Sequence, residues 1–322
     1  MTSPASTLPS EGERHDRESR LDRVWRSPRP VAVTAVIGGM RRGGGDPTYR
    51  LDQDGTVWRG LRTPHGPATL RLRVRAGLAE VDSAAWGAGA TWALDSVPAM
   101  LGALDDDAGF VPRHDAVARA ARRFGDWRVP RTGLVLEALI PAIIEQKVTG
   151  QEAFGSFRTL VHRYGERAPG AGGARGVWVQ PSAAGWVRIP SWEWLRASVD
   201  GARSAAAVRA AAVAGRVEQC VTLAPVEAEG RLRAIPGVGE WTAAEVRQRA
   251  LGDPDAVSFG DYHVAKNIGW ALLGREIDDA GLAELLEPYR GHRYRVQRLL
   301  ELDGARRPRR GPRMAPRTHL PR

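Results

Sequence analysis

The stretch LRAIPGVGEWTAAEVRQRALGDPDAVSFGDYHV, residues 232–264, is the most informative part of the chain. It predicts a helix, a Gly237-Val238-Gly239 turn, a second helix, and a loop that ends in one carboxylate, Asp261. The two glycines let the backbone turn sharply and put no Cβ in the way of an approaching group. A helix that begins at such a turn points its unpaired N–H groups at an anion. Because main-chain donors carry no sequence preference, the turn predicts phosphate binding that does not read a base sequence.

The motif I-P-G-V-G-E-W-T-A-A (235–244), followed by D-Y-H-V (261–264), resembles the helix-hairpin-helix DNA glycosylase superfamily. Within that superfamily it is most similar to the 3-methyladenine DNA glycosylase II branch, the AlkA-type enzymes. The family's catalytic Asp follows the hairpin at a spacing like that seen here, where Asp261 lies 22 positions after Gly239. The residues alone also allow a tight turn between two core helices with a surface Asp downstream.

Two further segments carry the resemblance. LEALIPAIIEQKVTG (136–150) is similar to the family segment that ends in a Gln, a wedge residue and a Val-Ser or Val-Thr. ELLEPYRGHRYRVQRLL (284–300) resembles the closing helix of the family. The resemblance covers roughly residues 30–302 and is loose in the front part.

The predicted fold class is α+β, with a small α/β domain before a helical core. Strand patterns dominate the front part, with VAVTAVI (31–37) expected as a strand and Gln53-Asp54-Gly55 as a hairpin turn. Helical patterns follow from about residue 112. The resemblance implies that these helices form an all-α, two-subdomain helix-hairpin-helix glycosylase core. The expected division is a disordered lead-in over 1–28, an N-terminal α/β domain over 29–110, the glycosylase domain over 111–302 and a basic, disordered tail over 303–322.

Composition limits the class of partner. The 322 residues carry a formal net charge of +10, which favours a polyanion such as nucleic acid. Part of the excess lies in residues 305–322, which contain seven Arg and no acidic residue. The single cysteine, Cys220, excludes an internal disulfide and the four-cysteine iron–sulfur cluster of some relatives, and the scattered histidines indicate no zinc site. No apolar stretch is long enough for a membrane span, so we expect a cytoplasmic, nucleoid-associated protein.

Asp261 is the predicted catalytic residue. Cleavage of an N-glycosidic bond builds positive charge on the sugar, and a fixed carboxylate stabilises that charge and can orient or deprotonate the attacking water. Alkylated purines such as 3-methyladenine already carry a positive charge and leave as neutral bases, so one carboxylate suffices. Asp is also a favoured N-cap, and a capping role for Asp261 is compatible with catalysis.

The resemblance implies a pocket for a flipped base. Trp241 lines it by stacking on an electron-poor base, and Tyr262 and Tyr289 complete an aromatic cage. Core packing is the alternative for each aromatic residue. The sequence departs from the branch at Glu245, where the branch has an aromatic residue. Three roles are open for the Glu245 carboxylate: it attracts a cationic base, it hydrogen-bonds a purine edge, or it faces solvent. Trp241 occupies the position of the Schiff-base Lys of the lyases, and an indole forms no imine, so the resemblance implies a monofunctional enzyme.

The expected DNA contacts are the hairpin turn and a wedge loop that fills the gap left by the extruded nucleotide. The predicted DNA-binding residues are Gly237, Val238, Gly239, Gln146, Lys147, Thr149 and Lys266. Lys147 stands where an apolar wedge is usual, and Lys266 is a phosphate contact or a surface charge. By resemblance, the carbonyls of Arg233, Ile235 and Val238 hold a monovalent cation, Na⁺ or K⁺, and no other cofactor is required.

These residues predict a monofunctional, monomeric DNA glycosylase that flips alkylated purines of the 3-methyladenine and 7-methylguanine type out of double-stranded DNA. Two alternatives remain open. One is a helix-hairpin-helix protein that binds DNA damage without catalysis, in which Asp261 has no chemical role. The other is a glycosylase for oxidised or mismatched bases, against which the missing cluster cysteines and Trp241 speak.

Overall fold

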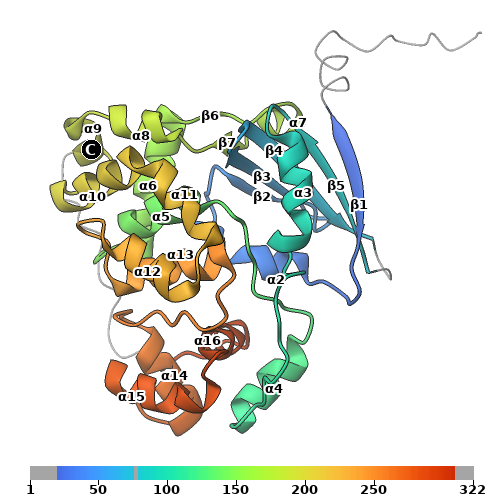
Figure 1. Ribbon diagram of the computed structural model, residues 1–322, viewed down its shortest axis with the longest axis vertical. Helices are drawn as coiled ribbons and strands as arrows, with labels where there is room; N and C mark the ends of the chain where they lie inside the picture. The colour runs from blue at the N-terminus through green and yellow to red at the C-terminus, as the bar shows by residue number, and fades with distance from the viewer. Residues whose placement is uncertain (1–19, 76–78, 309–322) are drawn as a thin grey trace, which may run out of the picture.

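The computed structural model describes residues 20–75 and 79–308. A five-stranded sheet lies on one side of the molecule and a helical region on the other (Figure 1). All strand pairs are antiparallel, and the strand order is β1-β5-β4-β3-β2. The strands are β1 (Leu21–Arg26), β2 (Tyr49–Leu51), β3 (Val57–Thr63), β4 (Gly66–Val74) and β5 (Glu80–Trp86).

Successive side chains of each strand point to opposite faces of the sheet, and both faces are covered by other parts of the chain. Leu61, Leu70 and Leu72 are fully buried on one face, beneath helices α2 (Val33–Gly38) and α3 (Ala90–Met100). On the other face, Trp58 and Trp86 stack with ring centroids 5.7 Å apart. They pack under apolar residues of the segment 166–179, which returns from the helical region. This segment contains the strand pair β6 (Glu166–Arg167) and β7 (Trp178–Val179) and, between them, the short helix α7 (Ala171–Ala174).

Residues 31–37 were predicted as a strand, and this prediction is wrong. The segment forms helix α2, which buries Val33, Val36 and Ile37 against the sheet. Their spacing of three and four residues is helical. The run of β-branched residues favoured a strand, but packing on the sheet decides its conformation. The chain just after α2 also reaches the cavity of the candidate site.

The predicted lead-in over 1–28 also needs correction. Residues 1–19 lie outside the described part of the chain, but Leu21–Arg26 form the edge strand β1, paired antiparallel with β5. The side chains of β1 are largely exposed, and Arg23 and Arg26 pair with Asp95 and Glu80. Because the strand has little buried apolar surface, its sequence carries no clear strand signal.

The helical region has two cores. The larger surrounds α5, whose ten residues are nearly all buried, including Pro141 inside the helix. The smaller joins α4, α14, α15 and α16 in the part of the chain seen at the bottom of Figure 1. The helices are α4 (Asp115–Arg123), α5 (Val135–Ile144), α6 (Gly150–Tyr164), α8 (Ala183–Arg188), α9 (Ser191–Arg196), α10 (Gly201–Ala212), α11 (Ala214–Glu218), η1 (Gln219–Thr222), α12 (Pro225–Arg233), α13 (Glu240–Val246), the π-helix η2 (Arg247–Leu251), α14 (Val264–Leu273), α15 (Asp279–Leu286), η3 (Glu287–Tyr289) and α16 (Arg293–Leu302). The predicted class, a small α/β domain before a two-part helical core, is confirmed apart from the short strands β6 and β7.

Buried ion pairs join the sheet to the helical region. Arg59 of β3 pairs with Glu137 of α5 at 2.7 Å, and both side chains are more than nine-tenths buried. Burial raises the pKa of Glu137, while Arg59 and the backbone N–H of Arg62 oppose that shift. A second pair, Arg42 with Glu145 at 2.8 Å, lies at the other end of α5. Moving the two regions relative to each other would separate these charges and leave a buried charge without its partner. The ion pairs therefore hold the two regions in one arrangement.

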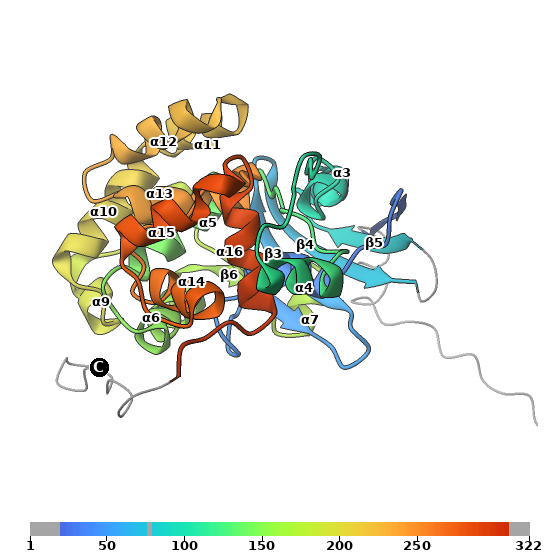
Figure 2. The same ribbon diagram turned by 90° about the horizontal axis from the view of Figure 1, so that it is seen from below.

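The end of the described chain continues past α16. Gly304 (φ +84°) turns the backbone, and residues 305–308 run past α14 (Figure 2). The backbone N–H of Arg307 donates to Asn267 Oδ1 at 3.1 Å, so the tail predicted as disordered over 303–322 has an anchored beginning. Residues 309–322 lie outside the described part. Within the described ranges no helix is long and apolar enough to cross a bilayer.

Candidate functional site

The predicted hairpin consists of α12, a turn and α13. Gly237 has φ +98°, and a Cβ built there would lie 2.6 Å from the Cβ of Ala206, so both conformation and packing require glycine. Gly239 has an ordinary φ of −94°, is exposed, and would place a Cβ in open space. The two glycines therefore have different roles. Gly237 serves the fold, and Gly239 leaves the surface of the turn open.

The predicted wedge loop is attached to this turn. The Gln146 amide donates to the Gly237 carbonyl at 2.9 Å and to Thr242 Oγ1 at 2.7 Å, so the loop after α5 and the hairpin form one surface. Lys147 follows with an exposed side chain and φ +56°, a left-handed conformation that is uncommon outside glycine. Such backbone strain is typical of functional loops. Thr149 is the N-cap of α6, and its hydroxyl is engaged with Glu152 in a capping box.

Asp261 is held in one orientation by three N–H groups. Its Oδ1 accepts from the backbone N–H of His263 at 2.7 Å and of Val264 at 3.0 Å, where α14 begins. Its Oδ2 accepts from the Trp241 indole N–H at 3.2 Å. Gly260 (φ +82°) makes the turn that brings the carboxylate to this position. Asp261 therefore caps α14 with one oxygen and faces Trp241 with the other.

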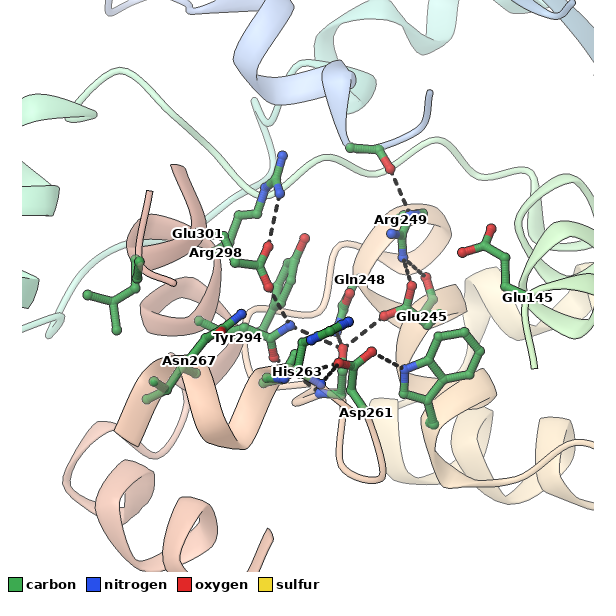
Figure 3. Close-up of a pocket in the computed structure, with 18 of the residues that line it drawn as sticks. Glu145, Glu245, Gln248, Arg249, Asp261, His263, Asn267, Tyr294, Arg298 and Glu301 are labelled. Atoms are coloured by element: carbon green, nitrogen blue, oxygen red, sulfur yellow. Dashed lines mark hydrogen bonds and ion pairs between the residues drawn. The ribbon is translucent and has the colours of Figure 1, made fainter. Parts of the chain in front are cut away.

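A cavity of about 400 Å³ opens beside Asp261 (Figure 3). A volume of this size is typical of small-molecule sites. The sheet region contributes to its wall through the segment after α2, and the helical region through α5, α13, η2, α14 and α16. The lining residues are Val36, Gly39, Met40, Pro130, Glu145, Trp241, Glu245, Gln248, Arg249, Ser258, Asp261, His263, Val264, Asn267, Ile268, Tyr294, Gln297, Arg298, Leu300, Glu301, Ala305 and Arg306.

A hydrogen-bond network forms one wall of the cavity. Ser258 Oγ donates to Glu245 Oε1 at 2.8 Å and accepts from Gln248 Nε2 at 2.8 Å and Gln297 Nε2 at 3.2 Å. Gln297 Nε2 also donates to Glu301 Oε1 at 3.0 Å. All of these residues except Glu301 are buried, so the network fixes the wall. The Glu245 carboxylate belongs to this network and does not face solvent.

Arg249 joins the two regions of the molecule within the cavity. Its Nη1 donates to Glu245 Oε2 at 2.7 Å, and its Nε donates to the Gly39 carbonyl, after α2, at 3.0 Å. Burial alone lowers the pKa of Arg249, but Glu245, Tyr294 and Glu145 raise it well above its ordinary value. Arg249 is thus a permanent cation that balances the carboxylates around it. It lies in the π-helix η2, an irregularity that is frequent at functional sites.

Glu145 supplies a further carboxylate at the end of α5. Burial raises its pKa, while Arg42 and Arg249 lower it. Glu145, Glu245 and Asp261 thus place three carboxylates in the cavity lining, and Arg249 is bonded to one of them, Glu245 (Figure 3). The cavity is therefore strongly polar, and its lining carries both acidic and basic side chains.

Two predicted pocket residues lie elsewhere, and these predictions are corrected. Tyr289 is buried in the core formed by α4, α14, α15 and α16, and its hydroxyl accepts from the Arg113 backbone N–H at 2.9 Å. Tyr262 is 65% exposed and absent from the cavity lining, although its neighbours Asp261 and His263 belong to it. Of the four predicted pocket residues, Trp241 and Glu245 line the cavity, so the predicted aromatic cage is not assembled.

Several cavity residues were not predicted. Tyr294 of α16 is buried in the cavity wall, where burial raises its pKa to about 12. Arg249 had a signal in the sequence, because it follows Glu245 by four residues on a predicted helix, the spacing of an ion pair. Gly39 and Met40 had none, since they follow a segment whose conformation was predicted wrongly.

The remaining predicted contacts lie outside the cavity. The Lys266 ammonium lies 3.7 Å from the centre of the Tyr262 ring. Among the carbonyls predicted to hold a cation, that of Ile235 accepts from the Val238 N–H at 2.9 Å and keeps a second lone pair. Within residues 20–75 and 79–308 no group of three or more His, Cys, Asp or Glu is placed to hold a metal ion.

Comparison with known proteins gives sequence matches to two curated proteins, from two strains of one species, and several fold matches. No model of a known protein family matches the chain. Over 153 residues it is 31% identical to a protein of Mycobacterium tuberculosis described as a probable bifunctional transcriptional activator/DNA repair enzyme AlkA. The match covers 44% of this chain and 29% of that protein, so the chain spans less than a third of the curated relatives it matches.

In fold, the chain is similar to the 3-methyladenine DNA glycosylase from Archaeoglobus fulgidus, with a TM-score of 0.71 and 15% identity over 88% of this chain and 98% of that one. It is also similar to the 8-oxoguanine glycosylase/lyase of Clostridium acetobutylicum in complex with double-stranded DNA containing cytosine opposite 8-oxoguanine. There the TM-score is 0.63, with 10% identity over 85% of this chain and 92% of that one.

Proposed function

We propose that this chain, whose fold is that of the helix-hairpin-helix DNA glycosylase superfamily, is a DNA N-glycosylase that excises alkylated purines from double-stranded DNA. The partial AlkA match and the fold matches support the resemblance to that superfamily predicted from the sequence. The AlkA match and the 3-methyladenine glycosylase fold support the alkylated substrate. We also propose that the protein acts as a monomer on the nucleoid, in base excision repair.

One observation carries the proposal. A carboxylate fixed by three N–H groups, Asp261, lies at the wall of a base-sized cavity and follows a hairpin with an open glycine turn. As the bond between C1′ and the base nitrogen breaks, its electron pair leaves with the base and positive charge develops on the sugar. Asp261 stabilises that charge without having to reorient. Water then adds to C1′ and loses a proton to Asp261 or to solvent, which leaves an abasic sugar.

Trp241 supports a monofunctional enzyme. Its indole ring lines the cavity and its N–H is bound to Asp261, so it positions the carboxylate and offers an aromatic face to a flipped base. An indole nitrogen cannot form the imine by which a lyase cuts the strand. The two lysines of the chain, Lys147 and Lys266, lie on the wedge loop and beneath Tyr262 and are absent from the cavity lining.

A second candidate function is the excision of a neutral damaged purine, oxidised or mismatched. The polar wall of Glu245, Gln248 and Gln297 favours it, because such a wall discriminates by hydrogen bonds, whereas a cationic base is best held by stacked aromatic rings. A neutral base needs protonation to leave. We propose Glu145 as the source of that proton, because burial raises its pKa against the opposing effects of its ion-pair partner Arg42 and of Arg249.

A panel of duplexes distinguishes these functions. We expect the wild-type protein to release 3-methyladenine and 7-methylguanine from methylated DNA. We expect release from deaminated or oxidised duplexes to be at least 100-fold slower, because those bases leave as anions unless protonated. The product strand stays intact until alkali treatment, and borohydride traps no covalent complex. Faster release of an oxidised or mismatched base selects the second candidate, and a trapped complex contradicts the monofunctional assignment.

We propose that no cofactor is required and that the hairpin carbonyls of Arg233, Ile235 and Val238 bind a monovalent cation, Na⁺ or K⁺. The free lone pair of Ile235 supports this. The same panel is therefore run in EDTA, with sodium or potassium as the salt. Retained activity in EDTA agrees with a site that has no divalent metal, and loss of activity contradicts it.

The two hairpin glycines give a matched test of DNA binding. Gly239→Ala fits the free protein, so stability stays within about 0.5 kcal/mol, but its methyl group occupies the space through which a phosphate approaches. We expect duplex affinity to fall about tenfold, equivalent to about 1.4 kcal/mol. Gly237→Ala should instead cost about 1–3 kcal/mol of stability through its positive φ and the contact with Ala206. Equal affinity of Gly239→Ala and wild type, by fluorescence anisotropy, contradicts phosphate binding at the turn.

A further inference from the structure

Tyr262 belongs to an exposed group of side chains at the rim of the cavity. Its neighbour in the chain is Asp261, but its own ring is 65% exposed and absent from the cavity lining. A single exposed ring is common on protein surfaces, so the groups around it decide whether it has a role. A role for this ring would be distinct from base stacking inside the cavity.

Two cations lie against this ring. The Lys266 ammonium is 3.7 Å from the ring centre, and the Arg307 guanidinium carbon is 5.7 Å from it. Lys266 comes from α14, and Arg307 from the segment that follows α16. A cation at these distances is attracted to an aromatic face, so the ring holds both side chains in place. We call Tyr262, Lys266 and Arg307 the Tyr262 surface.

Arg307 is positioned by further contacts. Its backbone N–H donates to Asn267 Oδ1 at 3.1 Å, and its Nη1 donates to Glu276 Oε1 at 2.8 Å. Asn267 and the preceding Arg306 both line the cavity. The segment 305–308, whose backbone runs past α14 (Figure 2), thus brings basic residues to the cavity from a part of the chain that the resembling motifs do not include.

The two cations can offset the repulsion between the Asp261 carboxylate and the phosphates of DNA. If Asp261 acts beside C1′ of a flipped nucleotide, the phosphates joined to that nucleotide lie close to a carboxylate, which repels them. Each strand carries one phosphate per about 3.4 Å of helix axis, so the strand cannot avoid this region. Cations on the outer side of Asp261 offset the repulsion.

We propose that the Tyr262 surface binds the phosphodiester backbone of the DNA strand that bears the flipped nucleotide. This inference rests on the proposed function and adds a third DNA contact to the hairpin turn and the wedge loop. Lys266 and Arg307 each contact a phosphate, and Tyr262 keeps them oriented and packs its exposed face against the neighbouring sugar. A lysine and an arginine held before DNA arrives lose less side-chain freedom on binding.

The test uses the full chain and a duplex with a tetrahydrofuran abasic-site analogue, with affinity measured by fluorescence anisotropy at several salt concentrations. We expect Lys266→Ala and Arg307→Ala each to weaken binding about tenfold near physiological salt. Each should also reduce the slope of log affinity against log salt by about one. Tyr262→Ala should weaken binding about fivefold, while Tyr262→Phe should weaken it less, because the ring is retained and only the hydroxyl contact with Arg307 is lost.

The matched control is Arg26→Ala. Arg26 is an exposed arginine that is also paired with a glutamate, Glu80, but it lies on β1 at the opposite edge of the molecule (Figure 1). We expect its affinity and salt slope to equal those of wild type. Circular dichroism verifies that each variant is folded.

The outcomes separate the two proposals. If Lys266→Ala and Arg307→Ala keep the wild-type affinity and salt slope while wild type binds DNA and releases bases, the Tyr262 surface is not a DNA contact and the glycosylase assignment stands. If Arg26→Ala loses as much affinity as they do, the effect is one of general charge and the surface is again rejected. If wild type neither binds the duplex nor releases a base, the proposed function itself fails.

Discussion

Asp261→Asn is expected to reduce the single-turnover rate of base release by at least about 1,000-fold, because it removes the charge that stabilises the sugar cation in a partly buried site. The substitution preserves shape. The Asn oxygen can still accept from the backbone N–H groups of His263 and Val264, so the cap on α14 remains. Its amide nitrogen then faces the Trp241 indole N–H in place of an acceptor, which is a small local cost.

DNA binding is the control for this variant. A carboxylate beside a polyanion opposes binding, so Asp261→Asn should bind an abasic-site analogue as tightly as wild type or more tightly. Loss of release together with retained binding assigns Asp261 to chemistry. If the variant releases bases at the wild-type rate, Asp261 is only a helix cap and the proposed mechanism is wrong.

Arg249→Met is expected to lower the free energy of unfolding by about 3–5 kcal/mol. The substitution leaves the buried Glu245 carboxylate without its cation and the Gly39 carbonyl without its donor. For a chain of this size the melting temperature should fall by roughly 10 °C. Because Arg249 ties the segment after α2 to α13, the cavity wall loosens and base release should fall as well.

A double variant distinguishes the loss of the ion pair between Arg249 and Glu245 from the loss of side-chain packing. Arg249→Met combined with Glu245→Leu removes both charges, so much of the stability should return. Base release should not recover, since the Ser258 network loses its acceptor. Arg247→Met, which breaks the neighbouring ion pairs with Glu229 and Asp253 outside the cavity, should destabilise the protein without a specific loss of release at low temperature. Equal stability of Arg249→Met and wild type contradicts this account of Arg249.

The sequence predicted the parts of the site that depend on local conformation. The glycine turn, the helices on either side of it and the position of Asp261 before α14 follow from glycine geometry and capping, which act over a few residues. The resemblance predicted that Gln146 belongs to a wedge loop, but not that this loop contacts the hairpin. The structure adds that contact, because the side-chain amide of Gln146 donates to the Gly237 carbonyl.

The sequence could not predict which distant residues complete the cavity. Gly39 and Met40 reach it because residues 33–38 fold as a helix against the sheet, although their β-branched residues favoured a strand. Tyr262 and Tyr289 match family positions, yet one turns outward beside Lys266 and the other fills a core under Arg113. The direction of a side chain depends on packing between elements, which a motif does not encode.

Without the predicted aromatic cage, a flipped base in this cavity would be held in another way. Glu245 stands where the branch that the sequence resembles has an aromatic residue. In the structure its carboxylate accepts hydrogen bonds from Ser258 and Arg249. We infer that stacking on Trp241 is combined with hydrogen bonds from the wall of the cavity, so the substrate range depends on that wall as much as on the charge of the base.

Chromatography of the bases released from methylated duplex DNA tests the claim that the cavity beside Asp261 excises a damaged purine. The wild-type protein is incubated with the duplex in enzyme excess, beside Asp261→Asn. We predict release of 3-methyladenine and 7-methylguanine by the wild type, an intact sugar–phosphate strand, and almost no release by the variant. Binding of the methylated duplex by both proteins with no release of any base would contradict the claim and leave a protein that binds DNA damage without chemistry.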